Sequence, residues 1–153
     1  MPNWCNNLIR ISGPRADVQR LANLLNGTEE PFSVIFPRPA SEDENWYDWN
    51  IANWGTKWDA NDFNMSVSDS DIHMHFSTAW SPSEGVTRRM SQRFPTLHIE
   101  HLYEEPGMAF EGKLVFENGE CTMDEQQDMT GSSCFFTDEG EENPDYVELC
   151  DRF

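Results

Sequence analysis

The sequence has few basic residues, few cysteines and no long apolar run, and each of these absences excludes a class of protein. Only 10 lysine and arginine residues stand against 28 aspartate and glutamate residues, so the formal net charge is −18. A broad phosphate-contacting surface needs clustered lysine and arginine, and the sequence therefore predicts no direct binding of nucleic acid. A membrane-spanning helix needs about 18 consecutive apolar residues, and no segment approaches that length.

The first residues, MPNWCNN, lack the basic and apolar regions of a signal peptide. We therefore expect a cytoplasmic protein with no membrane partner. The four cysteines have neither the paired spacing of a metal site nor the density of a secreted disulfide framework. These cysteines are Cys5, Cys121, Cys134 and Cys150. Free thiols are expected, while a bridge between Cys134 and Cys150 stays open.

Catalytic motifs are also absent from the sequence. It contains no nucleophile elbow, no cysteine–histidine signature and no paired-carboxylate motif. Its many acidic residues are too dispersed to single out a general acid and a general base. The sequence predicts no catalytic residue and no cofactor, and we expect a non-enzymatic protein.

The sequence does contain regular strand and helix patterns. Its 153 residues are the size of one domain, and 12% aromatic residues supply enough burial for one core. Apolar residues at every second position predict strands, and apolar residues three or four positions apart predict helices. The motif SPSE at 81–84 predicts a capping box in which Ser81 and Glu84 satisfy each other's backbone amides. In chain order we expect a strand at 6–12, a helix at 14–26, a strand at 32–36, a hairpin at 63–78, a helix at 82–94 and a strand at 97–103.

The dipeptide Asn-Gly at 118–119 predicts a two-residue turn in a second hairpin, at residues 108–123. The expected cross-strand pairs are Phe116 with Cys121, Leu114 with Met123, and the like-charged Glu117 with Glu120. The order of elements predicts an α+β fold with a ferredoxin-like antiparallel sheet and two helices on one face. A Trp-rich insertion at about 40–62, the added C-terminal β-hairpin and an acidic tail complete it. We expect a domain at 1–123 and an acidic C-terminal extension at 124–153.

Four of the six tryptophans, Trp46, Trp49, Trp54 and Trp58, lie within 13 consecutive positions. Trp46 and Trp49 lie on one stripe of an expected short helix at about 45–53, and Trp54 and Trp58 flank Gly55, which ends that helix in a left-handed conformation. One interpretation is a small aromatic core formed by Trp4, Trp49, Trp54 and Trp58. The alternative is a site in which a planar ring stacks on tryptophan while a lysine and a hydroxyl receive a phosphate or carboxylate. Its candidate residues are Trp4, Trp54, Gly55, Thr56, Lys57 and Trp58, and a salt bridge from Lys57 to Asp59 would explain the same residues.

Three histidines are weak candidates for a metal site. His73 and His75 share one face of an expected strand, and His98 and Glu100 share one face of another. If these two strands were adjacent, the side chains could converge on zinc. The simpler interpretation is that they are exposed sheet residues, and we predict no bound metal.

The motifs MPNWCNN and NWGTKWD, with the strand, glycine and helix after the first motif and the PRP that precedes the second, resemble the YubB-like family. The resemblance covers about residues 1–117. It implies a ferredoxin-like domain and a plasmid or phage setting. It implies no assigned activity and no catalytic residue, and it does not extend to the acidic segment after Met123.

The acidic residues are concentrated in the last third of the chain. Residues 1–99 carry 8 basic and 12 acidic side chains, net −4, whereas residues 100–153 carry 2 and 16, net −14. We expect this end to bind a basic host protein, such as a nucleic-acid-binding enzyme or a defence complex, and to inhibit it by resembling a row of phosphates. The alternatives are a small-ligand protein that uses Lys57, and an acidic surplus that serves only solubility. The candidate partner-binding residues are Glu117, Glu120, Asp124, Glu125, Asp128, Asp138, Glu139, Glu141, Glu142, Asp145 and Glu148.

Overall fold

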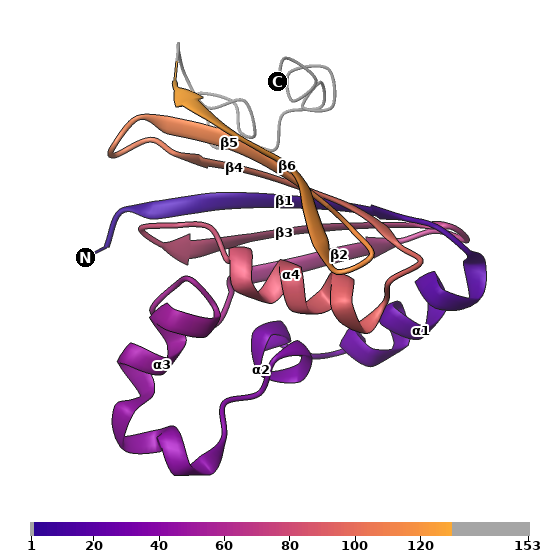
Figure 1. Ribbon diagram of the computed structural model, residues 1–153, viewed down its shortest axis with the longest axis horizontal. Helices are drawn as coiled ribbons and strands as arrows, with labels where there is room; N and C mark the ends of the chain where they lie inside the picture. Colours follow the sequence, from indigo (N-terminus) through magenta and orange to yellow (C-terminus); the bar gives the residue numbers. More distant parts are fainter. Residues whose placement is uncertain (1, 130–153) are drawn as a thin grey trace.

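Alternating apolar and polar residues form one six-stranded antiparallel sheet, and amphipathic segments form the helices that cover one of its faces (Figure 1). The computed structural model describes residues 2–129. Its strands are β1 (Trp4–Ser12), β2 (Asn61–Val67), β3 (Asp71–Ala79), β4 (His98–Glu105), β5 (Phe110–Glu117) and β6 (Glu120–Asp128). Its helices are α1 (Arg15–Leu25), α2 (Pro31–Ile35), α3 (Trp46–Asn53) and α4 (Glu84–Arg93), with a 3-10 helix at Ala40–Asn45.

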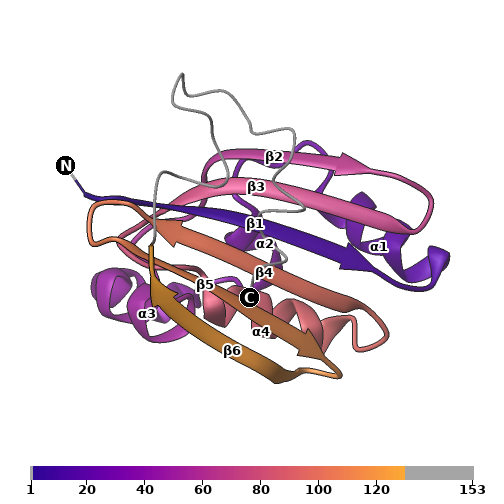
Figure 2. The same cartoon turned by 90° about the horizontal axis from the view of Figure 1, so that it is seen from above.

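The strands lie in the order β2-β3-β1-β4-β5-β6, and every neighbouring pair is antiparallel (Figure 2). The first four, together with α1 and α4, form the predicted ferredoxin-like arrangement, because each helix connects two strands that have a third strand between them. The second hairpin, β5 and β6, extends the sheet beyond β4. The α+β, ferredoxin-like prediction is confirmed.

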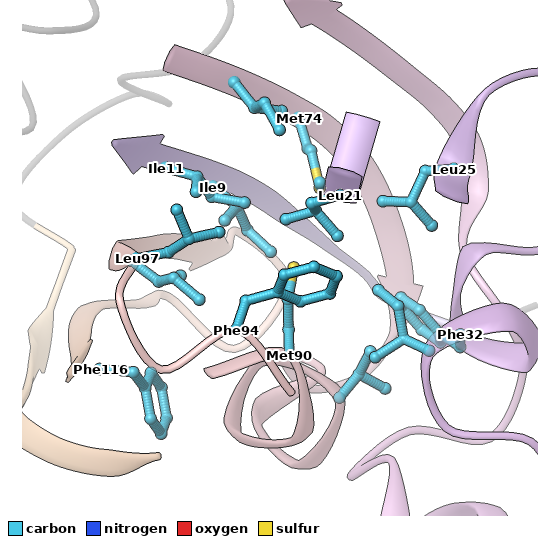
Figure 3. Close-up of a cluster of buried hydrophobic side chains, with 14 of the residues drawn as sticks. Ile9, Ile11, Leu21, Leu25, Phe32, Met74, Met90, Phe94, Leu97 and Phe116 are labelled. Atoms are coloured by element: carbon cyan, nitrogen blue, oxygen red, sulfur yellow. The ribbon is translucent and has the colours of Figure 1, made fainter. Parts of the chain in front are cut away.

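The core lies between the sheet and the helices. Alternate residues of β1 and β3 point toward the helices, and α1 and α4 turn their apolar stripes toward them. Figure 3 shows Leu21 of α1 and Met90 of α4 among side chains from these strands. The fully buried members include Ile9, Leu21, Leu25, Phe32, Ile72, Met90, Leu97, Ile99 and Phe116.

Residues 31–35 are a helix, so the strand expected at 32–36 is wrong. The apolar and β-branched composition of FSVIF suggests a strand, but a distant carboxylate decides otherwise. Asp59 accepts hydrogen bonds from the backbone amides of Phe32 and Ser33, both at 2.9 Å, and from the Ser33 hydroxyl at 2.8 Å. These bonds satisfy amides that the start of a helix leaves without partners.

Two local predictions also fail in detail. The capping box does not form, because Ser81 donates its hydroxyl to the Gly55 carbonyl at 2.6 Å and α4 begins only at Glu84. In the second hairpin Phe116 does pair with Cys121 and Glu117 with Glu120, but an irregularity after Val115 shifts the register. Met123 therefore lies opposite Val115 instead of Leu114.

The sheet continues past the expected domain boundary. Strand β6 runs to Asp128, so the first five residues assigned to the extension, 124–128, belong to the sheet. Most of the remaining extension lies outside the described residues, and so do Cys134 and Cys150. None of the helices in residues 2–129 is long and apolar enough to cross a membrane.

Gly85 allows the insertion to lie against α4. A Cβ atom at this position would overlap the carbonyl oxygen of Asn53, the last residue of α3. This oxygen belongs to the backbone, so it cannot rotate away as the end of a flexible side chain could. The end of α3 and the first turn of α4 can therefore touch only through a glycine.

Candidate functional site

Within the motif NWGTKWD, the first tryptophan points into the protein. Trp54 is 2% exposed, and its indole nitrogen donates to the Phe36 carbonyl at 2.8 Å. Its ring meets those of Trp49 and Phe32 edge to face, with centroids 5.7 Å apart in both pairs. Trp54 and Trp49 thus form part of the aromatic core that one interpretation predicted, and Trp54 is not available to a ligand.

Gly55 and Thr56 also serve the fold. Gly55 has φ +86°, the left-handed stop predicted for the end of the insertion helix, and its amide donates to the Asn50 carbonyl at 3.1 Å. Thr56 is fully buried, and its hydroxyl donates to the Ala79 carbonyl at 3.3 Å. The expected role of Thr56 as an anion ligand is therefore excluded by its burial.

Lys57 and Trp58 point outward, and the structure brings other aromatic residues to them. The Lys57 ammonium lies 4.5 Å from the ring centre of Trp58, 5.4 Å from that of Tyr47 and 5.7 Å from that of Trp80. Trp4 stands beside Trp58, with ring centres 6.4 Å apart. We call Trp4, Tyr47, Lys57, Trp58 and Trp80 the aromatic–lysine patch.

Asp59 does not neutralise Lys57. Its two carboxylate oxygens are occupied by the start of α2 and by the Ala60 amide at 2.8 Å. Within residues 2–129 no carboxylate lies within 4.0 Å of the Lys57 ammonium. The lysine is held by ring faces, which attract a cation through their quadrupole.

Sequence reasoning missed Tyr47 and Trp80 as members of this patch. Tyr47 is 43% exposed on α3, and Trp80 is 44% exposed just after β3. Trp80 has φ +65°, and the Ser81 amide donates to the Ala79 carbonyl at 2.9 Å, which closes a tight turn around it. A bulky residue rarely adopts a positive φ, and nothing in the sequence around Trp80 predicts this conformation.

The histidine candidates do not converge. Strand β1 lies between β3 and β4, so His73 and His98 are not on adjacent strands. Arg10 of β1 stands between them, opposite His73 on one side and Glu100 on the other, and it forms an ion pair with Glu100. Across residues 2–129 no group of three His, Cys, Asp or Glu side chains is placed to hold a metal.

A buried polar network links β1, β4 and α4. His101 is fully buried, with one ring nitrogen 2.7 Å from the Asn7 side-chain oxygen and the other 2.9 Å from the Thr87 hydroxyl. Burial lowers the pKa of His101 to about 3, so the ring is neutral at pH 7. Burial likewise raises the pKa of the Cys5 thiol to about 12, which keeps it protonated and unreactive.

The candidate acidic residues that the structure describes line the second hairpin. Glu117, Glu120, Asp124, Glu125 and Asp128 are all exposed. Glu117 accepts a hydrogen bond from His98 at 2.6 Å. Within the described part of the chain no cationic group lies within 4.0 Å of the other four carboxylates. The six candidates from Asp138 to Glu148 lie outside the described residues.

The hairpin belongs to a strongly acidic half of the sheet. Strands β4, β5 and β6 carry nine carboxylates and one lysine, net −8, while β1, β2 and β3 carry two carboxylates and one arginine, net −1. Three of these nine carboxylates are buried and accept hydrogen bonds from other residues of the protein. Glu104 accepts from Asn6 at 3.2 Å, Glu105 from the Gly107 amide at 2.8 Å, and Glu111 from Gln127 at 3.1 Å. We call β4, β5 and β6 the acidic half-sheet.

Comparison with known proteins identifies the family. Residues 53–149 match the family model described as the ferredoxin-like domain in Api92-like protein. The fold is similar to the crystal structure of a protein api92 from Yersinia pseudotuberculosis, with a TM-score of 0.66 and 10% sequence identity over 87% of this chain and 100% of that chain. No curated protein matches the sequence. The chain therefore belongs to the family of Api92-like proteins that carry this ferredoxin-like domain.

Proposed function

We propose that this member of the Api92-like family is a non-enzymatic binding protein whose acidic half-sheet engages a basic partner protein. The observation that carries the proposal is the outer strand β6. It presents Glu120, Asp124, Glu125 and Asp128 to solvent, and no cation within residues 2–129 lies within 4.0 Å of them. Carboxylates gathered on one edge attract a basic partner and speed its association.

The partner is a protein that itself handles nucleic acid, because such proteins present clustered lysine and arginine. From Glu120 to Asp128 the strand spans about 26 Å at ~3.3 Å per residue, so its four carboxylates lie about 9 Å apart on average. One strand of duplex DNA carries a charge every ~3.4 Å, roughly two and a half times that density. The carboxylates of this edge therefore match every second or third phosphate of one strand, and we propose that the edge inhibits the partner by competing with its nucleic acid.

The resemblance of MPNWCNN and NWGTKWD to the YubB-like family adds a setting to this proposal. On a plasmid or phage, a protein of this charge would act in the cytoplasm against a host defence or nucleic-acid-handling protein. This part rests on the resemblance and on the charge of the edge strand. The binding chemistry stands without it.

The test is capture of partners from a lysate of cells that carry the gene, with two matched variants. The hairpin variant E120Q/D124N/E125Q/D128N removes four charges from β6. The control variant E29Q/E30Q/E44Q/D48N removes four charges from exposed positions outside the acidic half-sheet. The wild type and the control should retain the same basic protein at low salt, release it as salt rises, and release it to added duplex DNA.

The hairpin variant should lose that protein. Its thermal unfolding should match the wild type, because exposed carboxylates contribute little to stability. Equal capture by the hairpin variant, or capture that neither salt nor duplex DNA reverses, would overturn the proposal.

A further inference from the structure

The aromatic–lysine patch lies apart from the acidic half-sheet in charge and in composition. It holds one cation, and three of its rings, Tyr47, Trp58 and Trp80, are between 40% and 44% exposed. Trp46, 38% exposed, continues it through an edge-to-face contact with Tyr47 at 5.8 Å. Half of the eight exposed large hydrophobic residues within 2–129 thus belong to the patch or touch it.

Tryptophan and tyrosine side chains at this level of exposure are grouped here in one patch. They are the residues that most often dominate the affinity of protein interfaces, since each supplies a large rigid area at small entropic loss. Single apolar residues scattered over a protein surface are normal and need no explanation. A contiguous exposed group of them indicates a binding surface.

The backbone conformation of Trp80 also supports a binding role for the patch. Its φ of +65° is a conformation that glycine adopts freely and that a bulky side chain adopts at an energetic penalty. The turn nevertheless holds a tryptophan, and it directs that ring over the Lys57 ammonium at 5.7 Å. The strained backbone conformation is therefore found at the residue whose exposed ring lies beside Lys57, and strain of this kind is concentrated at functional sites.

The charge of the patch selects its partner. Lys57 has ring faces around it and no carboxylate within 4.0 Å among the described residues, so an incoming carboxylate meets an ammonium already held in place. A polyanion such as nucleic acid would instead meet a chain of net charge −18 through a single lysine. A second copy of the chain would bring the same net charge.

From these contacts we infer that the aromatic–lysine patch is a second, independent binding surface, and that it takes a segment of a partner protein in which one carboxylate is flanked by apolar or aromatic side chains. The carboxylate pairs with Lys57, and the apolar side chains pack on Trp58, Tyr47 and Trp80. One ion pair makes this binding much less salt-dependent than that of β6.

The experiment is selection of a random peptide library on the folded full-length protein. Peptides with Asp or Glu within two positions of Trp, Phe or Leu should be enriched. A synthetic peptide of the enriched sequence should bind the wild type and lose about tenfold or more in affinity to Trp58→Ala and to Lys57→Met. Leu24→Ser, which changes an exposed apolar residue of α1, is the matched control and should bind as the wild type does.

Trp80→Gly separates binding from folding. Glycine accepts the positive φ, so this variant should unfold at a temperature no lower than that of the wild type while losing about tenfold in peptide affinity. The hairpin variant of β6 should bind the peptide normally, which keeps a failure here distinct from a failure of the proposed function.

Several outcomes would overturn the inference. They are enrichment of basic peptides or of none, equal binding by Lys57→Met, and quenching of tryptophan fluorescence by single-stranded DNA or a nucleotide with no response to the peptide. Dimerisation through the patch, seen as a loss of mass in Trp58→Ala on light scattering, would also overturn it.

Discussion

The Trp-rich segment at 46–60 and the β5–β6 hairpin are attached to the fold by different kinds of bond. In the first, side chains reach distant backbone: Trp54 donates to Phe36, and Asp59 accepts from Phe32. In the second, the two strands pair along their whole length and a turn with φ +55° at Asn118 and +77° at Gly119 joins them. Changes to the side chains that make these long-range bonds should therefore disturb the first region, whereas changes to the exposed side chains of β6 should be tolerated.

The largest expected effect divides the motif NWGTKWD itself. Trp54→Ala empties a buried aromatic site and leaves the Phe36 carbonyl without its donor, so it should lower the free energy of unfolding by about 3–5 kcal/mol. Trp58→Ala removes a ring that is 40% exposed and should lower it by less than about 1 kcal/mol. Denaturant unfolding measures both, and the hairpin variant gives the value for the other region. Equal losses in the free energy of unfolding for Trp54→Ala and Trp58→Ala would contradict the division of the motif into a buried and an exposed tryptophan.

The next largest expected effect is a dependence of the free energy of unfolding on pH, which comes from His101. As in the Trp-rich segment, a change to this one buried side chain should alter stability. The folded pKa of His101 is about 3 and the unfolded value is about 6.5, so the unfolded chain binds a proton first as pH falls. Its contribution to stability is complete above about pH 6.5 and is lost toward about pH 3, at no more than about 1.4 kcal/mol per pH unit.

Between pH 7 and pH 5 this should amount to about 2 kcal/mol, while most carboxylates stay ionised. His101→Gln, which keeps a polar side chain for Asn7 and Thr87, should be less stable at pH 7 but should lose that slope. The hairpin variant should retain it. Urea unfolding at a series of pH values makes the measurement, and an unchanged slope in His101→Gln would contradict the assignment.

The smallest effect concerns Asp59. Asp59→Ala removes the acceptor for the amides of Phe32 and Ser33 and should lower the free energy of unfolding by about 1 kcal/mol. Amide hydrogen exchange should rise at these two positions and stay constant in β5 and β6. Protection of Phe32 and Ser33 equal to that of the wild type would show that the helix does not need this carboxylate.

Much of the sheet could be predicted because its signals are local. The alternation of Ile9 and Ile11 with polar residues marks β1, and Asn118-Gly119 alone specifies the turn of the second hairpin. Two of the failures, the strand expected at 32–36 and the capping box at 81–84, share a cause, since each depends on a residue remote in sequence. Asp59 accepts from the Phe32 and Ser33 amides at the start of α2, and the Gly55 carbonyl accepts from the Ser81 hydroxyl that a capping box would need.

The candidate site was predictable only in part. The sequence shows that tryptophans gather around Lys57, but burial divides them, with Trp54 inside and Trp58 outside. That division depends on how the segment turns at Gly55, where φ is +86°. Trp80 joins the patch only because β3 ends beside β1, a pairing that the sequence near residue 80 does not encode.

The glycine at position 85 offers a way to sort homologous chains before any of them is crystallised. An aligned sequence with alanine or a larger residue there cannot dock the α3 segment as this chain does, because the side chain would occupy the place of a main-chain oxygen. Such a homologue must shorten, discard or redirect the segment, and with it Tyr47 and Lys57. A single alignment column therefore forecasts which relatives inherit the aromatic surface.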